Sequence, residues 1–220
     1  RIGGIGEIMK KIIDIQRQKG NRRRYTLHFD DGEWIGLFDE LIVKYGLETG
    51  KEVDSSKITQ LAQEDDAKRA LDMSIRYLGY RSRSQREMET YLQRKGFCED
   101  IIRRTIEKLE GYGYIDDSAF AREWVNSRMR AKPMGRSMIK RELIQKGIDD
   151  EIIEDSLSNV SDEEEEEQAY NLALKYSKRY QNLESRKQFY KIGQALARRG
   201  FGWDVIRRAN SRLNIEEQDE

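Results

Sequence analysis

The stretch Ser84-Gln-Arg-Glu-Met-Glu-Thr-Tyr-Leu-Gln-Arg-Lys-Gly96 decides the fold, because its pattern returns twice farther along the chain. Aligning Gly96 with Gly147 and Gly200 places a leucine four residues before each glycine and an apolar residue eight before it. Residues with these offsets share one helix face, and apolar residues at plus five, plus six and plus thirteen indicate a second helix. Ten positions after the glycine, the first two copies have the apolar residues Ile106 and Leu157, whereas the third copy has Asn210. We therefore predict repeats in which each glycine ends a helix in a left-handed turn.

The spacing of the anchor glycines leaves room for a third helix in every copy. Candidate helices with apolar residues at three and four spacing cover residues 66–78, 117–129 and 166–179. Ser84 and Glu87 have the capping-box spacing at the start of the helix that Gly96 ends. The chain is thus predicted to be mainly α, with three tandem three-helix repeats in an elongated curved array. The predicted repeats are residues 61–116, 117–162 and 163–220.

Residues 1–60 have a different pattern and are predicted to form a small β-rich domain. Short β-prone stretches are separated by Lys19-Gly20-Asn21 and Asp30-Asp31-Gly32, whose residue types suit hairpin turns. An antiparallel meander over roughly residues 8–38 follows from this pattern. Asp39 can cap a short helix that runs through Tyr45 and ends at Gly46, and Ser55 or Ser56 can cap a longer helix that begins near Lys57.

Composition excludes several classes of protein. A single cysteine, Cys98, excludes an internal disulfide framework and, without a signal-like or membrane-spanning apolar run, points to the cytoplasm. Neither Cys98 nor the one histidine, His28, lies in a zinc or catalytic motif, and no phosphate-binding glycine loop is present. We expect a monomer that is not an enzyme, uses no cofactor and has no membrane partner. Trp34, Trp124 and Trp203 each lie in an apolar pattern and are predicted to pack in cores or between repeats.

The neutral total of 41 basic and 41 acidic residues hides alternating blocks of charge. Residues 122–146 contain eight basic and two acidic residues, and residues 169–213 contain eleven basic and two acidic ones. Residues 149–167 contain eleven acidic residues and no basic one. Such runs are often solvated faces. We interpret the acidic run 162–167 as a loop leading into a helix; a helix start, and a role as DNA mimic or intramolecular shield of the basic faces, are the alternatives.

Clusters of basic residues recur on the middle helix of a repeat, just before it or on the helix that follows it, and these clusters are the candidate partner-binding sites. They can contact either phosphates or an acidic protein groove, and the sequence does not separate the two. The candidates are Arg81, Arg83 and Arg86 in the first repeat, Lys132, Arg136, Lys140 and Arg141 in the second, and Arg198, Arg199, Arg207 and Arg208 in the third.

Three motifs resemble the RecX family, in family order over residues 70–155. They are Tyr77-Leu-Gly-Tyr-Arg-Ser-Arg-Ser-Gln-Arg-Glu-Met88 with Lys95-Gly-Phe97, Gly111-Tyr-Gly-Tyr-Ile-Asp-Asp-Ser-Ala-Phe-Ala-Arg122 through Trp124, and Lys132-Pro-Met-Gly-Arg136 with Arg141-Glu-Leu143 and Lys146-Gly-Ile148. The repeat pattern extends the likeness to about residue 213. The N-terminal meander is similar to that of the longer RecX proteins of Bacillus relatives.

The resemblance implies a regulator that binds the RecA filament on single-stranded DNA along its helical groove. Such a protein slows the ATPase of the filament, its extension and strand exchange. Reversing the charge of Arg136 and Lys140 is then expected to weaken inhibition while the helical fold stays intact. The alternative is a DNA-binding helical repeat protein that competes for single- or double-stranded DNA, and a structural adaptor for another helical partner is a third interpretation.

Overall fold

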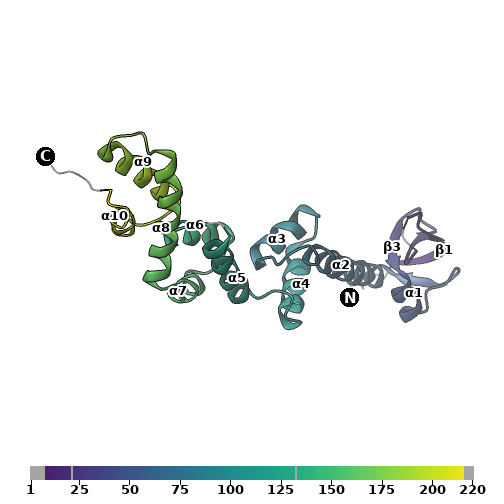
Figure 1. The fold of residues 1–220 in the computed structure, drawn as a ribbon. Coiled ribbons are helices and arrows are strands. Elements are labelled where there is room, and N and C mark those ends of the chain that lie inside the picture. The colour runs from purple at the N-terminus through teal and green to yellow at the C-terminus, as the bar shows by residue number, and fades with distance from the viewer. Residues whose placement is uncertain (1–7, 21, 132, 216–220) are drawn as a thin grey trace, which may run out of the picture. The chain divides into compact units, whose positions relative to one another are not determined.

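A computed structural model describes residues 8–20, 22–131 and 133–215 of the chain. The described residues form four strands and ten helices, so the predicted mainly helical fold with an N-terminal sheet is confirmed (Figure 1). The chain divides into two compact units, one of residues 1–81 with 89–114 and the other of residues 82–88 with 115–220. The helix that Gly96 ends is thus divided, because its first residues belong to the second unit and the rest of it belongs to the first.

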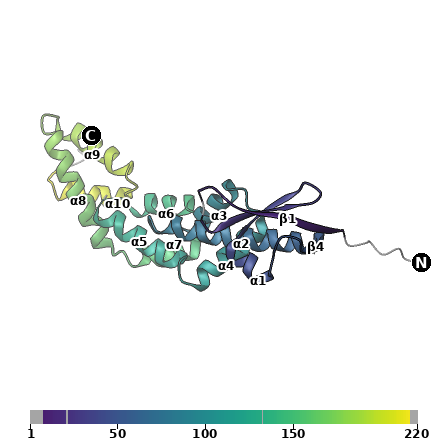
Figure 2. The same ribbon diagram turned by 90° about the vertical axis from the view of Figure 1, so that its right-hand side faces the viewer.

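The N-terminal sheet is antiparallel, with its strands in the order β3-β2-β1-β4. One face packs against α1 and α2 around a core that contains Ile12, Leu27 and Leu37 (Figure 2). The predicted meander and the helix that ends at Gly46 are confirmed, but the expected cap at Asp39 is wrong, because Asp39 is the first helical residue and the N-cap is Phe38. Nothing in the sequence pattern indicated β4, which is three residues long with one buried side chain. The bounds are Met9–Arg17 for β1, Arg24–Phe29 for β2, Trp34–Phe38 for β3, Asp39–Tyr45 for α1 and Glu52–Asp54 for β4.

The long helix α2, Ser55–Leu78, differs from its prediction in two ways. Its N-cap is Asp54, whose carboxylate accepts the N–H of Lys57 at 2.7 Å, so the expected cap at Ser55 or Ser56 is wrong. The helix also runs unbroken through the residues predicted as a separate helix from residue 66, because no glycine or proline interrupts residues 55–78.

A buried ion pair fastens the sheet to α2. Arg24 Nη2 lies 2.7 Å from Asp65 Oδ2, and the Phe38 N–H donates to Asp65 Oδ1 at 2.9 Å. Burial raises the pKa of the Asp65 carboxyl, while Arg24 and the Phe38 N–H favour its ionised form and oppose that rise. The three partners therefore hold β2, β3 and α2 in one arrangement.

Each repeat contains three helices, and the glycine turns have the predicted geometry. Gly96, Gly147 and Gly200 have φ of 85°, 78° and 84°. The N–H of the following residue donates to the carbonyl of the leucine four residues before each glycine, at 3.3, 3.1 and 3.3 Å. The remaining helices are α3 Gln85–Arg94, α4 Glu99–Gly111, α5 Asp117–Arg130, α6 Arg136–Gln145, α7 Asp150–Ser158, α8 Asp162–Arg179, α9 Ser185–Ala197 and α10 Trp203–Ser211.

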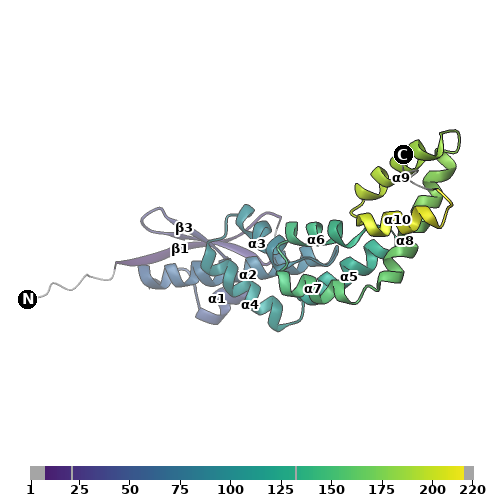
Figure 3. The same cartoon turned by 90° about the vertical axis from the view of Figure 1, so that its left-hand side faces the viewer.

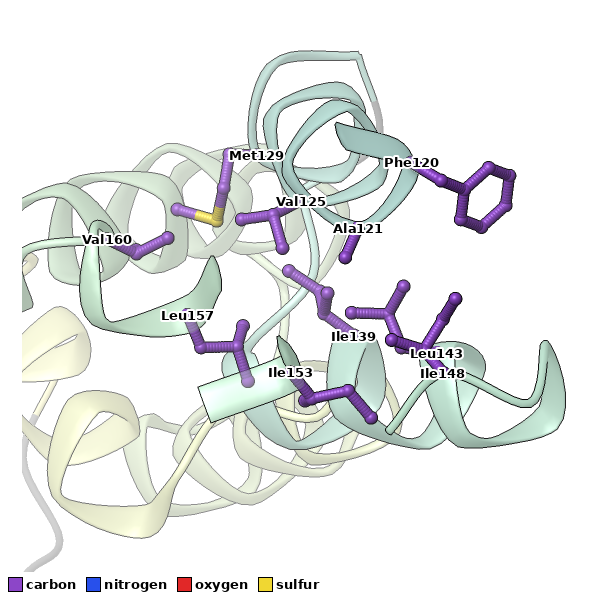
Figure 4. Packing of buried hydrophobic residues seen from close by; sticks show 10 residues of the cluster. All are labelled: Phe120, Ala121, Val125, Met129, Ile139, Leu143, Ile148, Ile153, Leu157 and Val160. Atoms are coloured by element: carbon purple, nitrogen blue, oxygen red, sulfur yellow. The ribbon is translucent and has the colours of Figure 1, made fainter. Parts of the chain in front are cut away.

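The second and third repeats each have a core of their own within the second unit. Figure 4 shows the second core, in which Val125 of α5, Ile139 and Leu143 of α6 and Ile153 of α7 point toward one another. The third core lies among α8, α9 and α10 (Figure 3). There Asn210, which departs from the apolar pattern, is fully buried, and neither polar atom of its side chain has a hydrogen-bond partner among the described residues. A buried amide without such partners lowers the stability of this core.

The three tryptophans do not share one environment. Trp34 is 66% exposed, so its predicted packing in a core is wrong. Trp124 packs partly buried against the core of the second repeat, and its indole N–H donates to Glu142 Oε2 at 2.8 Å. Trp203 is 45% exposed, and its ring lies edge-on to Phe189 with centroids 6.1 Å apart. The sequence pattern placed Trp34 on a strand correctly but did not determine which face of the sheet was covered.

Replacing Asp65 by alanine is expected to lower the free energy of unfolding by about 3 kcal/mol, because Arg24 then keeps a buried charge without its partner. Asp31→Ala, which removes a carboxylate from a more exposed pair with Lys10, is the matched control and is expected to have a much smaller effect, because solvent screens this pair. Urea unfolding followed by circular dichroism measures both. Equal effects of the two substitutions would contradict the assigned role of Asp65.

Candidate partner-binding surface

The candidate surface is organised by the junction of the second and third repeats. At this junction the segment that begins α6 lies against the turn after α9. The Gly135 N–H donates to the Arg199 carbonyl at 2.9 Å, and the Ser137 hydroxyl donates to the Gly200 carbonyl at 2.6 Å. A Cβ atom on Gly200 would lie 2.4 Å from the Cβ of Met138. Gly200 therefore serves both the left-handed turn and the close approach of the two repeats.

The same kind of contact occurs at Gly147, within the second unit. The hydroxyl of Ser84 donates to the Lys146 carbonyl at 2.7 Å, and a Cβ on Gly147 would lie 2.2 Å from Cδ of Arg86. Ser84 also accepts the N–H of Glu87 at 3.3 Å, as its helix-capping position predicted. A Cβ on Gly96, by contrast, would meet nothing within 4 Å. The three glycines look equivalent in sequence, and only two of them support a junction.

The acidic run is the start of α8, so its interpretation as a loop is wrong. Ser161 and Glu164 form a capping box there, and carboxylates in a first helical turn are favoured by the helix dipole. Several of these carboxylates bind basic residues of the second unit. The pairs are Asp162 with Arg136 at 2.8 Å, Glu165 with Arg136 at 3.4 Å, Glu166 with Arg208 at 2.7 Å and Glu167 with Arg212 at 2.9 Å. This arrangement agrees with the alternative of an intramolecular shield.

Arg136 is the centre of this network. Its backbone N–H donates to Glu165 Oε1 at 2.9 Å, and its guanidinium also donates to the carbonyl of Val160. Glu165 is only 6% exposed, so its charge depends on Arg136 for compensation. We therefore expect that reversing the charge of Arg136 destabilises the second unit, whereas the sequence alone led us to expect an intact fold.

Other basic residues that the sequence predicted to bind a partner also interact with groups of the chain itself. The Lys140 ammonium binds Glu154, and this hydrogen bond raises the pKa of Lys140. Arg207 pairs with Asp204 at 2.7 Å, one helical turn away. The Arg199 guanidinium makes a long contact of 3.4 Å with the Pro133 carbonyl. These interactions compensate part of the charge that the sequence assigns to a basic face.

Two candidates, Arg141 on α6 and Arg198 at the end of α9, are exposed and form no ion pair with any residue in the described part of the chain. The segment that begins α6 lies beside the turn that follows α9, through the Gly135 N–H and the Arg199 carbonyl. Arg86 is exposed with its stem against Gly147, Arg81 is exposed and Arg83 is half-buried. Lys132 lies outside the described residues. Arg122 and Arg130 of α5 were not among the individual candidates predicted from the sequence.

The described residues contain neither a metal-binding cluster nor a membrane-spanning helix. No group of three histidine, cysteine or carboxylate residues is placed there to hold a metal ion. Nor does any described helix have the length and apolar character needed to cross a membrane. His28 is half-buried in β2, and Cys98 is exposed next to the start of α4.

Comparisons with known proteins agree with the three-repeat pattern. Family models described as the first, second and third three-helix domains of RecX match residues 70–109, 116–157 and 163–209. The chain is 34% identical to Regulatory protein RecX of Bacillus licheniformis over 96% of this chain and 80% of that protein, and 30% identical to the Bacillus subtilis protein of the same name with the same coverage. A crystal structure of regulatory protein RecX superposes with a TM-score of 0.71 at 28% identity, covering 94% of this chain and all of that one.

Gly200→Ala is expected to lower the free energy of unfolding of the second unit by about 2 to 4 kcal/mol. A positive φ costs alanine about 1 kcal/mol, and the clash with Met138 adds about 1 to 3 kcal/mol. Gly96→Ala is the control, because it has the same strain without the clash and should cost only about 1 kcal/mol. Denaturant unfolding compares them, and equal losses would show that the junction tolerates a side chain.

Arg136→Gln is expected to destabilise the second unit by about 2 kcal/mol, because it leaves the buried carboxylate of Glu165 without a cation. Lys140→Gln removes a pair that is largely exposed and should destabilise the unit much less, because solvent screens this pair. Both substitutions lie on α6 and remove one positive charge. Thermal unfolding of the two variants measures the difference, and a stability of Arg136→Gln close to that of Lys140→Gln would contradict the network.

Proposed function

The chain belongs to the RecX family of regulatory proteins, and we propose that it regulates a RecA recombinase by binding the RecA filament on single-stranded DNA. Bound there, it inhibits the ATPase of the filament, its extension and strand exchange. It acts by binding and catalyses no reaction itself. Family membership supplies the class of partner, and the charges of the second unit supply the proposed contact.

The observation that carries this proposal is the uneven pairing of the basic residues. Arg136, Lys140, Arg207 and Arg208 are neutralised within the chain, whereas Arg141 and Arg198 extend into solvent. An exposed arginine without an internal carboxylate can donate to a carboxylate or phosphate of a partner at little structural cost. We therefore assign the first contact with the filament to Arg141 and Arg198 rather than to the paired cations.

The repeat architecture supports a polymeric partner. The chain has three tandem three-helix repeats, and tandem repeats can engage neighbouring subunits of a filament at the same time. Linked contacts of this kind raise the overall affinity without requiring that any one of them be strong. A single bound molecule can then influence several recombinase subunits, so inhibition is expected below one molecule per subunit.

A charge reversal of the exposed pair tests the proposal. Arg141→Glu with Arg198→Glu is expected to raise the concentration needed for half-inhibition of the RecA ATPase about tenfold, because attraction to the partner becomes repulsion. Lys175→Glu with Lys178→Glu is the matched control, since both lysines are exposed on α8 and the change in net charge is the same. Circular dichroism checks that both variants retain their helices.

The ATPase is titrated with single-stranded DNA in large excess, so that competition for free DNA cannot account for inhibition. Inhibition that survives this excess and weakens only in the Arg141 and Arg198 variant supports filament binding. Inhibition that disappears with excess DNA would favour the alternative, a DNA-binding repeat protein that competes for the strand. An equal loss in the control variant would remove this pair of arginines from the contact.

A further inference from the structure

The hairpin of β1 and β2 carries a second concentration of positive charge, outside the residues matched by the three family domains. Residues 15–28 contain five basic residues and no acidic one. They lie where β1 ends, across the turn, and where β2 begins. The basic residues are Arg17, Lys19, Arg22, Arg23 and Arg24.

Two of these cations have structural partners. Arg24 is the nearly buried partner of Asp65, and Arg23 binds the carboxylate of Glu40. Both interactions connect the start of β2 to helices of the first unit. They hold the turn end of β2 in place, and their charges are compensated within the chain.

The other three basic residues of the hairpin have no carboxylate partner among the described residues. Arg17 donates from Nε and Nη2 to the Arg22 carbonyl at 3.1 and 2.9 Å, which ties the two sides of the turn together. The Arg17, Lys19 and Arg22 side chains are exposed, and none of the three forms an ion pair with a residue that the structure describes. The end of the hairpin therefore presents three positive charges on a backbone held by its own hydrogen bonds.

The surroundings of these charges favour phosphate over protein as the partner. In the strand register, Gln16 and Thr26 are neighbours on the same face, and Gln18 donates to the Thr26 hydroxyl at 3.1 Å. The exposed large apolar residues of the sheet, Ile8, Met9, Ile13 and Trp34, all lie outside this stretch. Protein interfaces usually contain apolar or aromatic anchors, whereas phosphate oxygens are bound by arginine, lysine and small polar side chains.

We propose that the end of the β1–β2 hairpin binds the phosphate backbone of a nucleic acid through Arg17, Lys19 and Arg22. The contact is independent of base sequence, because charges aimed at phosphates carry no sequence information. It is strongly dependent on salt, because each neutralised phosphate releases counterions. This interface is separate from the RecA contact proposed above, and no recombinase is needed to observe it.

The test measures binding of the full chain to a fluorescent oligothymidylate by anisotropy over a series of salt concentrations. Lys19→Gln with Arg22→Gln is expected to raise Kd about tenfold at low salt. The plot of log association constant against log salt concentration should become less steep. The magnitude of its slope should decrease by about 1.4, or about 0.7 for each lost phosphate contact on a single strand. Both side chains are exposed, and the Arg22 carbonyl that Arg17 binds is unchanged by the substitution.

Two further variants keep the test decisive. Arg94→Gln with Lys108→Gln removes two exposed cations from helices of the same unit and should leave Kd within about twofold of the unmodified chain. Lys19→Arg with Arg22→Lys preserves the charge and should bind as the unmodified chain does. Unchanged binding of the Gln variant, or an equal loss in the Arg94 and Lys108 variant, would overturn the proposal.

Vesicles that contain phosphatidylserine test whether the hairpin binds the phosphate groups of a lipid surface rather than those of a nucleic acid. We expect the full chain to bind the oligothymidylate and to remain unbound in a vesicle flotation assay at the same salt concentration. Vesicle binding that is as strong as DNA binding and is lost in the Lys19 and Arg22 variant would overturn the assignment to nucleic acid. Both ATPase variants keep the hairpin and are titrated at the same DNA concentration, so neither result changes the difference expected between them and the two proposals can fail separately.

Discussion

The left-handed glycine turn is the constraint on which the rest of the helical structure depends. It lets the N–H of the following residue reach a carbonyl one turn back, and so it ends the middle helix and starts the next. At Gly147 and Gly200 the missing side chain has a second effect, because the start of another helix approaches the backbone closely. A single residue type thus determines both the reversal within a repeat and the junction to the segment before it.

Charge has two separate uses in this chain. The carboxylates at the start of α8 satisfy the helix dipole and also bind arginines from α6 and α10, so the acidic run stabilises the second unit. At the N-terminal sheet, Asp65 has a comparable role toward Arg24. Cations that are engaged in this way are poor candidates for partner binding. Among the candidate residues that remain exposed and uncompensated, Arg141 and Arg198 are proposed to contact the filament. Arg17, Lys19 and Arg22 are proposed to contact nucleic acid.

The candidate site could be predicted only in part. The sequence showed that basic residues recur on the middle helices, but it could not show that Arg136 faces Glu165, because the two are far apart along the chain and meet only after folding. The same is true of Arg24 and Asp65. The basic cluster of the hairpin is visible in the sequence as Arg22-Arg-Arg24, but it lies outside the helical repeats from which the candidates were chosen. Adjacent arginines there have different partners, which no local pattern reveals.

The sequence by itself determined the three-helix repeats, the glycine turns, the meander and the membership of a family, because helix period, strand alternation and positive φ are properties of neighbouring residues. The tertiary structure decided which glycines support a junction, why Trp34 is exposed, where β4 pairs and which cations are neutralised. Each of these depends on residues brought together from distant parts of the chain. Local periodicity can place a side chain on a face, but only the folded chain decides what covers that face.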